Sequence, residues 1–167
     1  MKRPEPVKVI KERRDTALAK LADQVPYASW LGIGFERKGD ELTATLPFAE
    51  KVIGNPTLPA IHGGVTAAFL EATAMIELAW SMLWDEIESG RIDPAALTPE
   101  TMPRLPKTID ITIDYLRPGL PRDAYARARV VRSGRRYASV QVEAWQDNRA
   151  RLFAAATGHF LMPERER

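Results

Sequence analysis

A pair of glycines and one carboxylate near the middle of the chain are the residues best placed to do chemistry. Gly63 and Gly64 follow a loop rich in proline and open a long apolar segment that runs to Trp84, and Glu71 lies inside that segment. Glycines at the start of a helix let another molecule approach the backbone, and the N–H groups of the first turn have no partner within the helix. Such an end favours an oxygen that bears negative charge.

Glu71 differs from the other polar residues of this segment in its helical phase. With residues about 100° apart, one polar stripe holds Thr66, Thr73, Glu77 and Ser81, and Glu71 lies about 140° from Thr66. The residues three and four positions away from Glu71 are all apolar. A carboxylate in such surroundings is desolvated unless a group outside the helix pairs with it, and that environment suits a catalytic acid or base. An ordinary glutamate at a helix edge is the competing interpretation, and Glu77 is interpreted as part of a solvated face.

Length and composition indicate one globular domain. The chain has 167 residues, with 45% hydrophobic and 28% charged residues, a net charge of +2 and no cysteine. The charge is too small to favour nucleic acid as a partner, and the lack of cysteine fits a reducing compartment. The N-terminal residues lack the apolar core of a signal peptide, and Glu71 and Glu77 interrupt the longest apolar run, which argues against a membrane partner. We therefore expect a cytoplasmic protein.

Hydrophobic periodicity predicts the elements before the glycine pair. An amphipathic helix is expected over 6–22, with the basic residues Lys11, Arg13 and Arg14 on its outer face. A short helical turn over 27–32 is expected to bury Trp30 and Leu31. The period then changes to two, which predicts a hairpin over 33–46 with its turn at 38–40.

The remainder of the chain alternates strongly after one segment that is hard to interpret. Four prolines interrupt 85–106, which is a functional loop, an interface element or a mobile segment. Strict alternation over 108–115 predicts a half-buried strand with Ile109, Ile111, Ile113 and Tyr115 on one face. Further strands are expected over 124–130, 138–144 and 152–161. The sum is an α+β domain over 27–163 with an insertion at 85–106 and an N-terminal helical extension over 1–26, the antiparallel sheet being wrapped around a long central helix.

Three motifs give this pattern a family resemblance. With HGGVTAAFLE, TIDITIDYLRPG and the RSGRR turn at matching places, the chain resembles the hotdog-fold thioesterases over about 27–162. It is most similar to the PaaI-like group, which holds phenylacetyl-CoA thioesterases and some 4-hydroxybenzoyl-CoA thioesterases. The resemblance implies a homodimer or a dimer of dimers (a homotetramer) that hydrolyses an acyl-CoA without any cofactor beyond the CoA of the substrate.

The same resemblance assigns roles to individual residues. Glu71 occupies the position of the family's catalytic carboxylate, nine residues after His62. The N–H of Gly63 corresponds to the group that polarises the thioester carbonyl, and Gly64 holds the turn. Thr108 corresponds to a hydroxyl that the partner subunit contributes to assist water.

Other site residues are less well matched to the family. An Asn or Gln usually lies six residues before the His, where this chain has Pro56, so Asn55 reaches the site only if the loop bulges by one residue. His62 is interpreted as a residue that bonds the loop backbone, although it is also a possible base. Arg132, Arg135 and Arg136 either hold the phosphates of CoA or form a solvated turn. Trp80, Trp84 and Tyr115 are expected in the core or at an interface.

Several alternatives remain open on the sequence. Two histidines and no cysteine leave no spacing typical of a metal site, and no P-loop or Gly-x-Ser-x-Gly elbow occurs. The leading hypothesis is a thioesterase for an aryl- or medium-chain acyl-CoA, with Glu71 as general base or as nucleophile. A sensor that binds acyl-CoA or lipid without turnover is the alternative, and a hydratase or dehydratase would need an Asp/His pair at other spacings.

Overall fold

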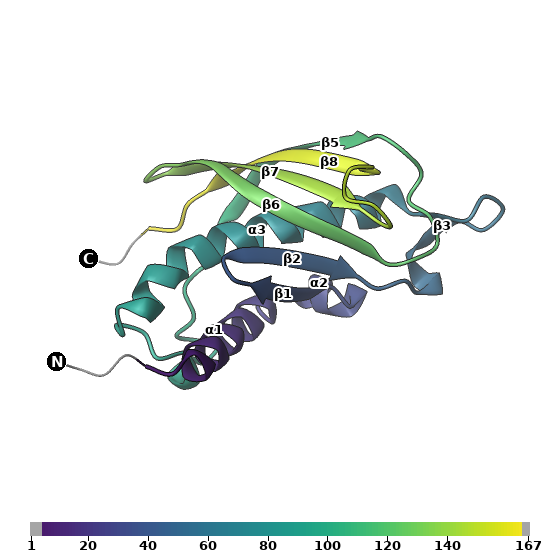
Figure 1. Cartoon of the computed structure of the whole chain (residues 1–167). Helices are drawn as coiled ribbons and strands as arrows, with labels where there is room; N and C mark the ends of the chain where they lie inside the picture. The colour runs from purple at the N-terminus through teal and green to yellow at the C-terminus, as the bar shows by residue number, and fades with distance from the viewer. Residues whose placement is uncertain (1–4, 165–167) are drawn as a thin grey trace.

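The computed structural model describes residues 5–164, which form one antiparallel sheet, a long helix and smaller elements around them (Figure 1). In chain order the elements are α1 (Val7–Ala22), α2 (Pro26–Leu31), β1 (Gly34–Lys38), β2 (Glu41–Leu46), the 3-10 turn η1 (Glu50–Val52), β3 (Ile53–Asn55), β4 (Ala60–Ile61), α3 (Gly63–Glu88), the 3-10 turn η2 (Pro94–Ala96), β5 (Lys107–Tyr115), β6 (Ala124–Ser133), β7 (Tyr137–Trp145) and β8 (Ala154–Leu161). The predicted N-terminal helix, the hairpin and the central helix are confirmed, and the last strand begins two residues later than expected.

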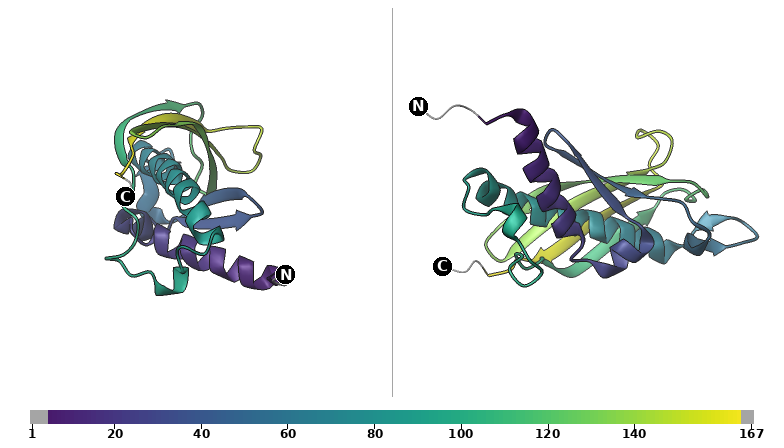
Figure 2. Two further views of the ribbon diagram at one scale, coloured as in Figure 1. Left: turned by 90° about the vertical axis from the view of Figure 1, so that its left-hand side faces the viewer. Right: turned by 90° about the horizontal axis from the view of Figure 1, so that it is seen from below.

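The six-stranded sheet curls around α3. Its strand order is β1-β2-β6-β7-β8-β5, with every neighbouring pair antiparallel. An end-on view shows the sheet arching over the helix, with α1 on the side that the sheet leaves open (Figure 2). The expected α+β architecture, a sheet wrapped around a central helix, is therefore confirmed.

The concave face of the sheet carries small and branched side chains. Alternate residues of β6, β7 and β8 point to α3 and are fully or almost fully buried, among them Ala126, Val140, Val142 and Ala156. Phe69 and Leu70 of α3 fill the space between helix and sheet, with no exposed surface. Small residues on the strands allow the helix to approach closely, and the burial of this layer supplies the main apolar stabilisation.

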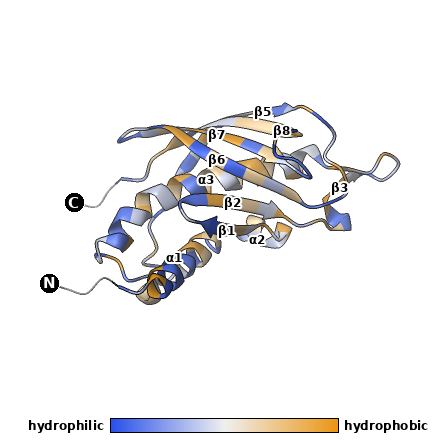
Figure 3. Cartoon of the chain, in the orientation of Figure 1, coloured by the Kyte–Doolittle hydropathy of each residue, from blue (hydrophilic) through white to orange (hydrophobic). Residues whose placement is uncertain are grey.

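A second apolar cluster joins α1 to the C-terminal half of α3. Ala17, Leu18 and Leu21 of α1 pack against residues of α3 that include Trp80 and Leu83. Figure 3 shows a hydrophilic and a hydrophobic side on this helix. The amphipathic pattern of the N-terminal extension therefore exists because α1 covers the part of α3 that the sheet does not reach.

The segment 85–106, which the sequence left uninterpreted, is fastened to α1. The Lys20 ammonium donates hydrogen bonds to the carbonyl oxygens of Pro94 (2.8 Å), Ala95 (3.0 Å) and Leu97 (2.8 Å). A single ammonium that satisfies three carbonyls orders η2 and its flanks against the helix. These contacts argue against the mobile segment among the three interpretations, and the segment covers part of α1.

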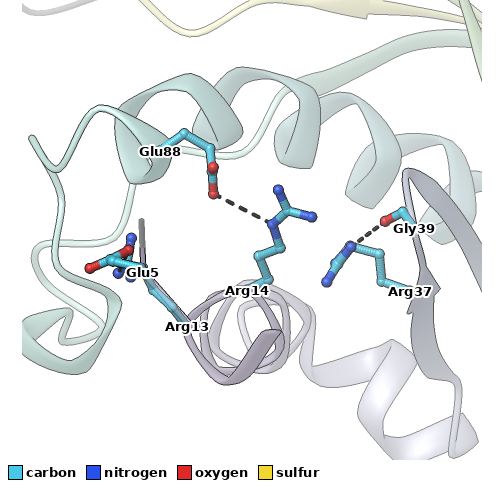
Figure 4. A network of polar contacts seen from close by, with 6 residues as sticks. All are labelled: Glu5, Arg13, Arg14, Arg37, Gly39 and Glu88. Atoms are coloured by element: carbon cyan, nitrogen blue, oxygen red, sulfur yellow. Dashed lines mark hydrogen bonds and ion pairs between the residues drawn. The ribbon is translucent and has the colours of Figure 1, made fainter. Parts of the chain in front are cut away.

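Arg13 and Arg14, near the middle of α1, and Arg37 of β1 make a set of polar contacts (Figure 4). Arg14 donates from Nε to Glu88 at 3.4 Å, and its guanidinium lies 3.6 Å from the ring centroid of Trp84. Arg13 pairs with Glu5, and Arg37 on β1 bonds the carbonyl of Gly39. Within the basic run, Arg14 therefore has partners on α3 and Arg13 pairs with Glu5, so these two arginines do not belong to a purely solvated face.

Two burial expectations are wrong, and both concern residues placed by periodicity alone. Leu31 is buried as expected, but Trp30 is 58% exposed, because α2 is only six residues long and buries Ala28 beside Leu31. The polar stripe of α3 is not solvated, since Thr66 and Thr73 are 3% and 2% exposed and only its end at Ser81 reaches the surface. Contacts from both sides enclose α3, so its polar stripe is largely covered too.

Helix α3 is long and apolar enough to cross a membrane by length and composition, but 61% of its most apolar window is buried inside the fold. Its hydropathy is therefore explained by its position between the sheet and α1. A core helix of this kind needs no lipid to cover it.

Enclosure of α3 changes the chemistry of Glu77. Burial raises the pKa of the Glu77 carboxyl from 4.5 to about 7. The folded state then binds this proton more tightly than the unfolded state, so the carboxyl lowers stability as the pH rises from about 4.5 to about 7. A difference of this size corresponds to a penalty of up to about 3 kcal/mol above neutral pH.

We therefore expect Glu77→Gln to stabilise the fold in a pH-dependent way. The free energy of unfolding, measured by urea denaturation, should exceed that of the parent by up to about 3 kcal/mol at pH 8. The difference should shrink toward pH 4, where the parent carboxyl is protonated in both states. Glu50→Gln, at an exposed glutamate of η1, is the matched control and should leave the pH profile unchanged. A pH-independent effect of Glu77→Gln would contradict the assignment.

Candidate active site

Glu71 is paired with a hydroxyl of β5. Thr108 donates from Oγ1 to Oε1 of Glu71 at 2.6 Å, and both side chains are half-buried. Both residues of this pair belong to the same chain. The resemblance had implied that a partner subunit supplies this hydroxyl, and that expectation stays a prediction beside the contact within the chain.

A β-bulge explains how Thr108 reaches the helix. Thr108 lies opposite the buried Phe160, but the next registered pair is Asp110 with His159, so Ile109 is an extra residue. Two residues of β5 then oppose one of β8, and the facing of the side chains changes across the bulge. Ile109 is 51% exposed, contrary to the strict alternation, while Thr108 shares the inner face with Ile111.

The N-terminus of α3 is capped by His62. Nδ1 of His62 accepts a hydrogen bond from the N–H of Gly64 at 2.9 Å, and His62 is the N-cap residue of the helix. A ring nitrogen that accepts a hydrogen bond carries no proton, so the cap requires neutral imidazole. This hydrogen bond agrees with the interpretation of His62 as a residue that bonds the backbone.

Two glycines lie close to His62, and there is no room for a side chain at Gly54. A Cβ at Gly54 would lie 2.8 Å from Cα of His62, and one at Gly64 would lie 3.0 Å from its Nδ1. Ordinary Cβ atoms do not approach backbone atoms that closely, so a side chain at Gly54 would displace the loop. At Gly64 a Cβ would press on the His62 ring, which agrees with the prediction that Gly64 holds the turn.

Tyr115 also contacts this turn, which the sequence did not indicate. Its hydroxyl donates to the carbonyl oxygen of Gly63 at 2.8 Å. Its ring is the nearest group to the position that a Cβ of Gly63 would occupy, at 3.5 Å. Tyr115 is 57% exposed, so it belongs neither to the buried core nor to a solvated surface without contacts. Its place at the end of a strand of otherwise regular alternation gave no signal of this role.

Asn55 has a local structural partner. Its side-chain oxygen accepts hydrogen bonds from the N–H groups of Thr57 (3.0 Å) and Leu58 (3.4 Å), which closes the turn between β3 and β4. That strand pair carries the chain to the start of α3, because Ile53 is registered with Ile61. The register of this strand pair shifts between Ile53 and Asn55, before the segment that joins Asn55 to His62, so a role of Asn55 in the site stays a prediction.

The arginines of the β6–β7 turn lie at the same end of the sheet as Thr108. Thr108 is registered with Phe160 and Phe160 with Ala138, so two strand spacings, about 10 Å, separate β5 from β7 at this level. The exposed side chains of Arg132, Arg135 and Arg136 follow beside that row. The structure brings Glu71 and Thr108 into contact. It does not bring these arginines into contact with either residue, so one ligand would have to be extended to touch both places.

The geometry can support attack on a carbonyl group. Glu71 lies about 12 Å along the axis from Gly63, and side chains on a helix tilt toward its N-terminus, so the carboxylate leans toward the open turn. An oxyanion at the N–H groups of that turn and a water near Glu71 would both fit this arrangement. Among residues 5–164 no cluster of three metal-binding side chains occurs. The site thus offers a carboxylate, a hydroxyl and a helix N-terminus.

Comparison with known proteins agrees with this geometry. The family model described as the acyl-CoA thioesterase N-terminal domain matches residues 54–161, which include both α3 and β5. The chain belongs to the acyl-CoA thioesterase family. The match decides between the enzyme and the binding sensor in favour of a thioester hydrolase.

Individual relatives extend the match to most of the chain. The medium/long-chain acyl-CoA thioesterase YigI of Escherichia coli K12 is 30% identical over 142 residues, which cover 83% of this thioesterase and 86% of the relative. A crystal structure of a Chromobacterium violaceum protein is 31% identical, has a TM-score of 0.63 and covers 96% of this chain and 100% of its own. The BH2602 protein of Bacillus halodurans, crystallised with CoA, has a TM-score of 0.60 at 24% identity and covers 93% and 94%. The hotdog fold of this thioesterase is confirmed.

Proposed function

We propose that Glu71 is the catalytic carboxylate of this thioesterase and that the Gly63 N–H polarises the thioester carbonyl. The observation that supports this most strongly is the 2.6 Å hydrogen bond from Thr108 to Glu71, on the helix whose first turn begins at Gly63. A carboxylate that is held by one hydroxyl keeps its second oxygen free for a water or a carbonyl carbon. That is the requirement for general base or nucleophilic catalysis.

The reaction balances with water as the only second reactant. Oxygen from water bonds to the thioester carbonyl carbon, either directly or after Glu71 has formed an anhydride, and the carbon–sulfur bond breaks. The CoA sulfur leaves and ends as the thiol, and the acyl group leaves as a carboxylate. Negative charge on the carbonyl oxygen is stabilised at Gly63, and Thr108 fixes the orientation of the carboxylate. We propose that no metal or other cofactor takes part.

For the substrate we propose a medium-chain aliphatic acyl-CoA. YigI acts on medium- and long-chain acyl-CoA according to its name, and it matches this thioesterase over 83% of the chain. The inner face near Glu71 is apolar, with Ala68 and Met75 half-buried one turn away on α3. An alkyl chain gains free energy by covering such side chains. For the compartment we propose the cytoplasm, which cell fractionation would test.

For the CoA moiety we propose the arginine turn between β6 and β7. Its guanidinium groups present paired donors that match phosphate oxygens, and the turn lies at the Thr108 end of the sheet. The crystal structure of BH2602 contains CoA, which supports a CoA site on this fold. For Asn55 we propose a role in holding the turn before α3.

We also propose that the thioesterase is a homodimer, which could further assemble as a dimer of dimers. Strand β5 lies at the edge of the sheet and exposes Ile109 (51%) and Tyr115 (57%), and Leu116 (52%) is exposed directly after it. A nine-residue edge strand with exposed large side chains is normally covered, and an identical strand can pair with it. Glu71 and Thr108 are only half-buried, so a second subunit at this edge would help to enclose the substrate.

Substitution of the carboxylate tests the proposed chemistry. We expect Glu71→Gln to lower kcat by about 10² to 10⁴-fold in a thiol-release assay with medium-chain acyl-CoA, because the amide neither accepts a proton nor attacks carbon. Glu36→Gln, at an exposed glutamate of β1, should retain parental activity. Excess EDTA should leave the parental rate unchanged. Full activity of folded Glu71→Gln would refute the assignment.

Charge reversal tests the CoA site. We expect the double substitution Arg135→Glu and Arg136→Glu to raise KM by about 10-fold or more while kcat changes little, because it removes charge-assisted bonds to phosphate. The effect should weaken as salt is added. Arg151→Glu is the matched control, since Arg151 is exposed between β7 and β8 at the opposite end of the sheet. An equal rise in KM for the control would show a nonspecific charge effect and contradict the proposed site.

The assembly can be measured directly by sedimentation equilibrium. We expect a mass of two or four times the 18.7 kDa of the chain. Ile109→Asp should shift the distribution toward monomer, because it places a charge on the exposed edge of β5. A parental protein that remains monomeric at assay concentrations and above would contradict the proposal.

A further inference from the structure

One peptide group at the start of α3 is held from both sides. The group that joins Gly63 to Gly64 consists of the Gly63 carbonyl and the Gly64 N–H. The carbonyl accepts a hydrogen bond from the Tyr115 hydroxyl at 2.8 Å, and the N–H donates to Nδ1 of His62 at 2.9 Å. The two partners come from elements far apart in sequence, since Tyr115 ends β5 and His62 precedes α3.

This peptide is flanked by the backbone bonds of two glycines, Gly63 before it and Gly64 after it. Glycine has the widest choice of backbone angles of any residue, so two successive glycines do not by themselves fix the orientation of the peptides around them. The N–H of Gly63 belongs to the peptide immediately before the clamped one. Its direction is therefore determined through the backbone angles of Gly63, which the clamp on the next peptide restricts.

We propose that Tyr115 is a positioning residue, which together with His62 holds the Gly63–Gly64 peptide so that the Gly63 N–H points at the developing oxyanion. This inference rests on the proposed role of Gly63. Its physical basis is preorganisation, because a donor that is fixed in advance loses no orientational freedom when charge develops on the substrate oxygen. The effect is consequently expected in the rate of the chemical step more than in substrate affinity.

Strand β5 then contacts the site at two points. Its first inner residue, Thr108, bonds Glu71, and its last residue, Tyr115, bonds the turn at Gly63. The strand therefore runs antiparallel to the first turns of the helix and sets the separation between the carboxylate and the oxyanion donor. A displacement of β5 would change both groups together.

The variant Tyr115→Phe removes one hydrogen bond and keeps the ring against Gly63. We expect kcat to fall about 5- to 20-fold with KM changed less than about 2-fold, which is the magnitude associated with one hydrogen bond. Tyr137→Phe is the matched control, because Tyr137 is likewise exposed, at 61%, on a strand of the same sheet and its hydroxyl has no recorded partner among residues 5–164. The control should keep the parental kcat.

A double-mutant cycle separates positioning from general support of the fold. Residues that hold the same peptide do not act independently, so the fold-loss in kcat of Tyr115→Phe combined with His62→Ala should differ from the product of the single losses by more than about 2-fold. A product within about 2-fold would overturn the inference, as would an unchanged kcat in Tyr115→Phe. Thermal unfolding and sedimentation of each variant confirm that fold and assembly are intact.

The outcomes distinguish this inference from the proposed function. If Glu71→Gln is inactive while Tyr115→Phe keeps the parental kcat, the carboxylate assignment stands and the positioning role of Tyr115 fails. If Glu71→Gln retains activity, the catalytic assignment itself fails. A loss in Tyr115→Phe that appears only in KM would also overturn the inference, because a preorganised oxyanion donor acts in the transition state.

Discussion

The structure depends on one constraint, which is that α3 must be covered on nearly all of its circumference. The helix is 26 residues long, and half of these side chains are buried. A curled sheet covers one side and places the small residues of β6 to β8 against it. Helix α1 covers the C-terminal half of the other side, and Lys20 fixes the segment around η2 against α1. The site lies along the part of α3 that neither layer encloses fully.

This cover explains why two glutamates of one helix differ. Glu71 lies where α3 meets the edge strand β5, and Thr108 supplies it with a short hydrogen bond. Glu77 lies on the covered polar stripe, and burial raises the pKa of its carboxyl to about 7. Helical phase alone would have assigned the desolvated position to Glu71. The difference arises from tertiary contacts, because the same polar stripe that looks solvated on a helical wheel lies under other elements.

Periodicity and glycine placement were sufficient to predict the helices, the hairpin and the wrapped sheet. The position of Glu71 and the start of α3 at Gly63 were also predictable, since they follow from local sequence and from the family motifs. The bulge at Ile109 was not, because a strand of strictly alternating residues contains no local sign that one of them is unpaired. The contact between Tyr115 and Gly63 was missed for a related reason: it joins residues 52 positions apart through one hydroxyl. Register and tertiary contact decide such features.

The strand order also has a consequence for how the chain acquires its shape. Strand β5 is made before β6, β7 and β8, yet within residues 5–164 its neighbour in the sheet is β8, which follows both β6 and β7 in the chain. Strand β2 also pairs with β6, which follows about 80 residues later in the chain. Nonlocal pairing of this kind is slow, because loop closure must precede the contacts that reward it. During synthesis Thr108 has no neighbouring strand to hold it beside α3 until β8 has been made, so the contact between β5 and Glu71 depends on a late, nonlocal pairing.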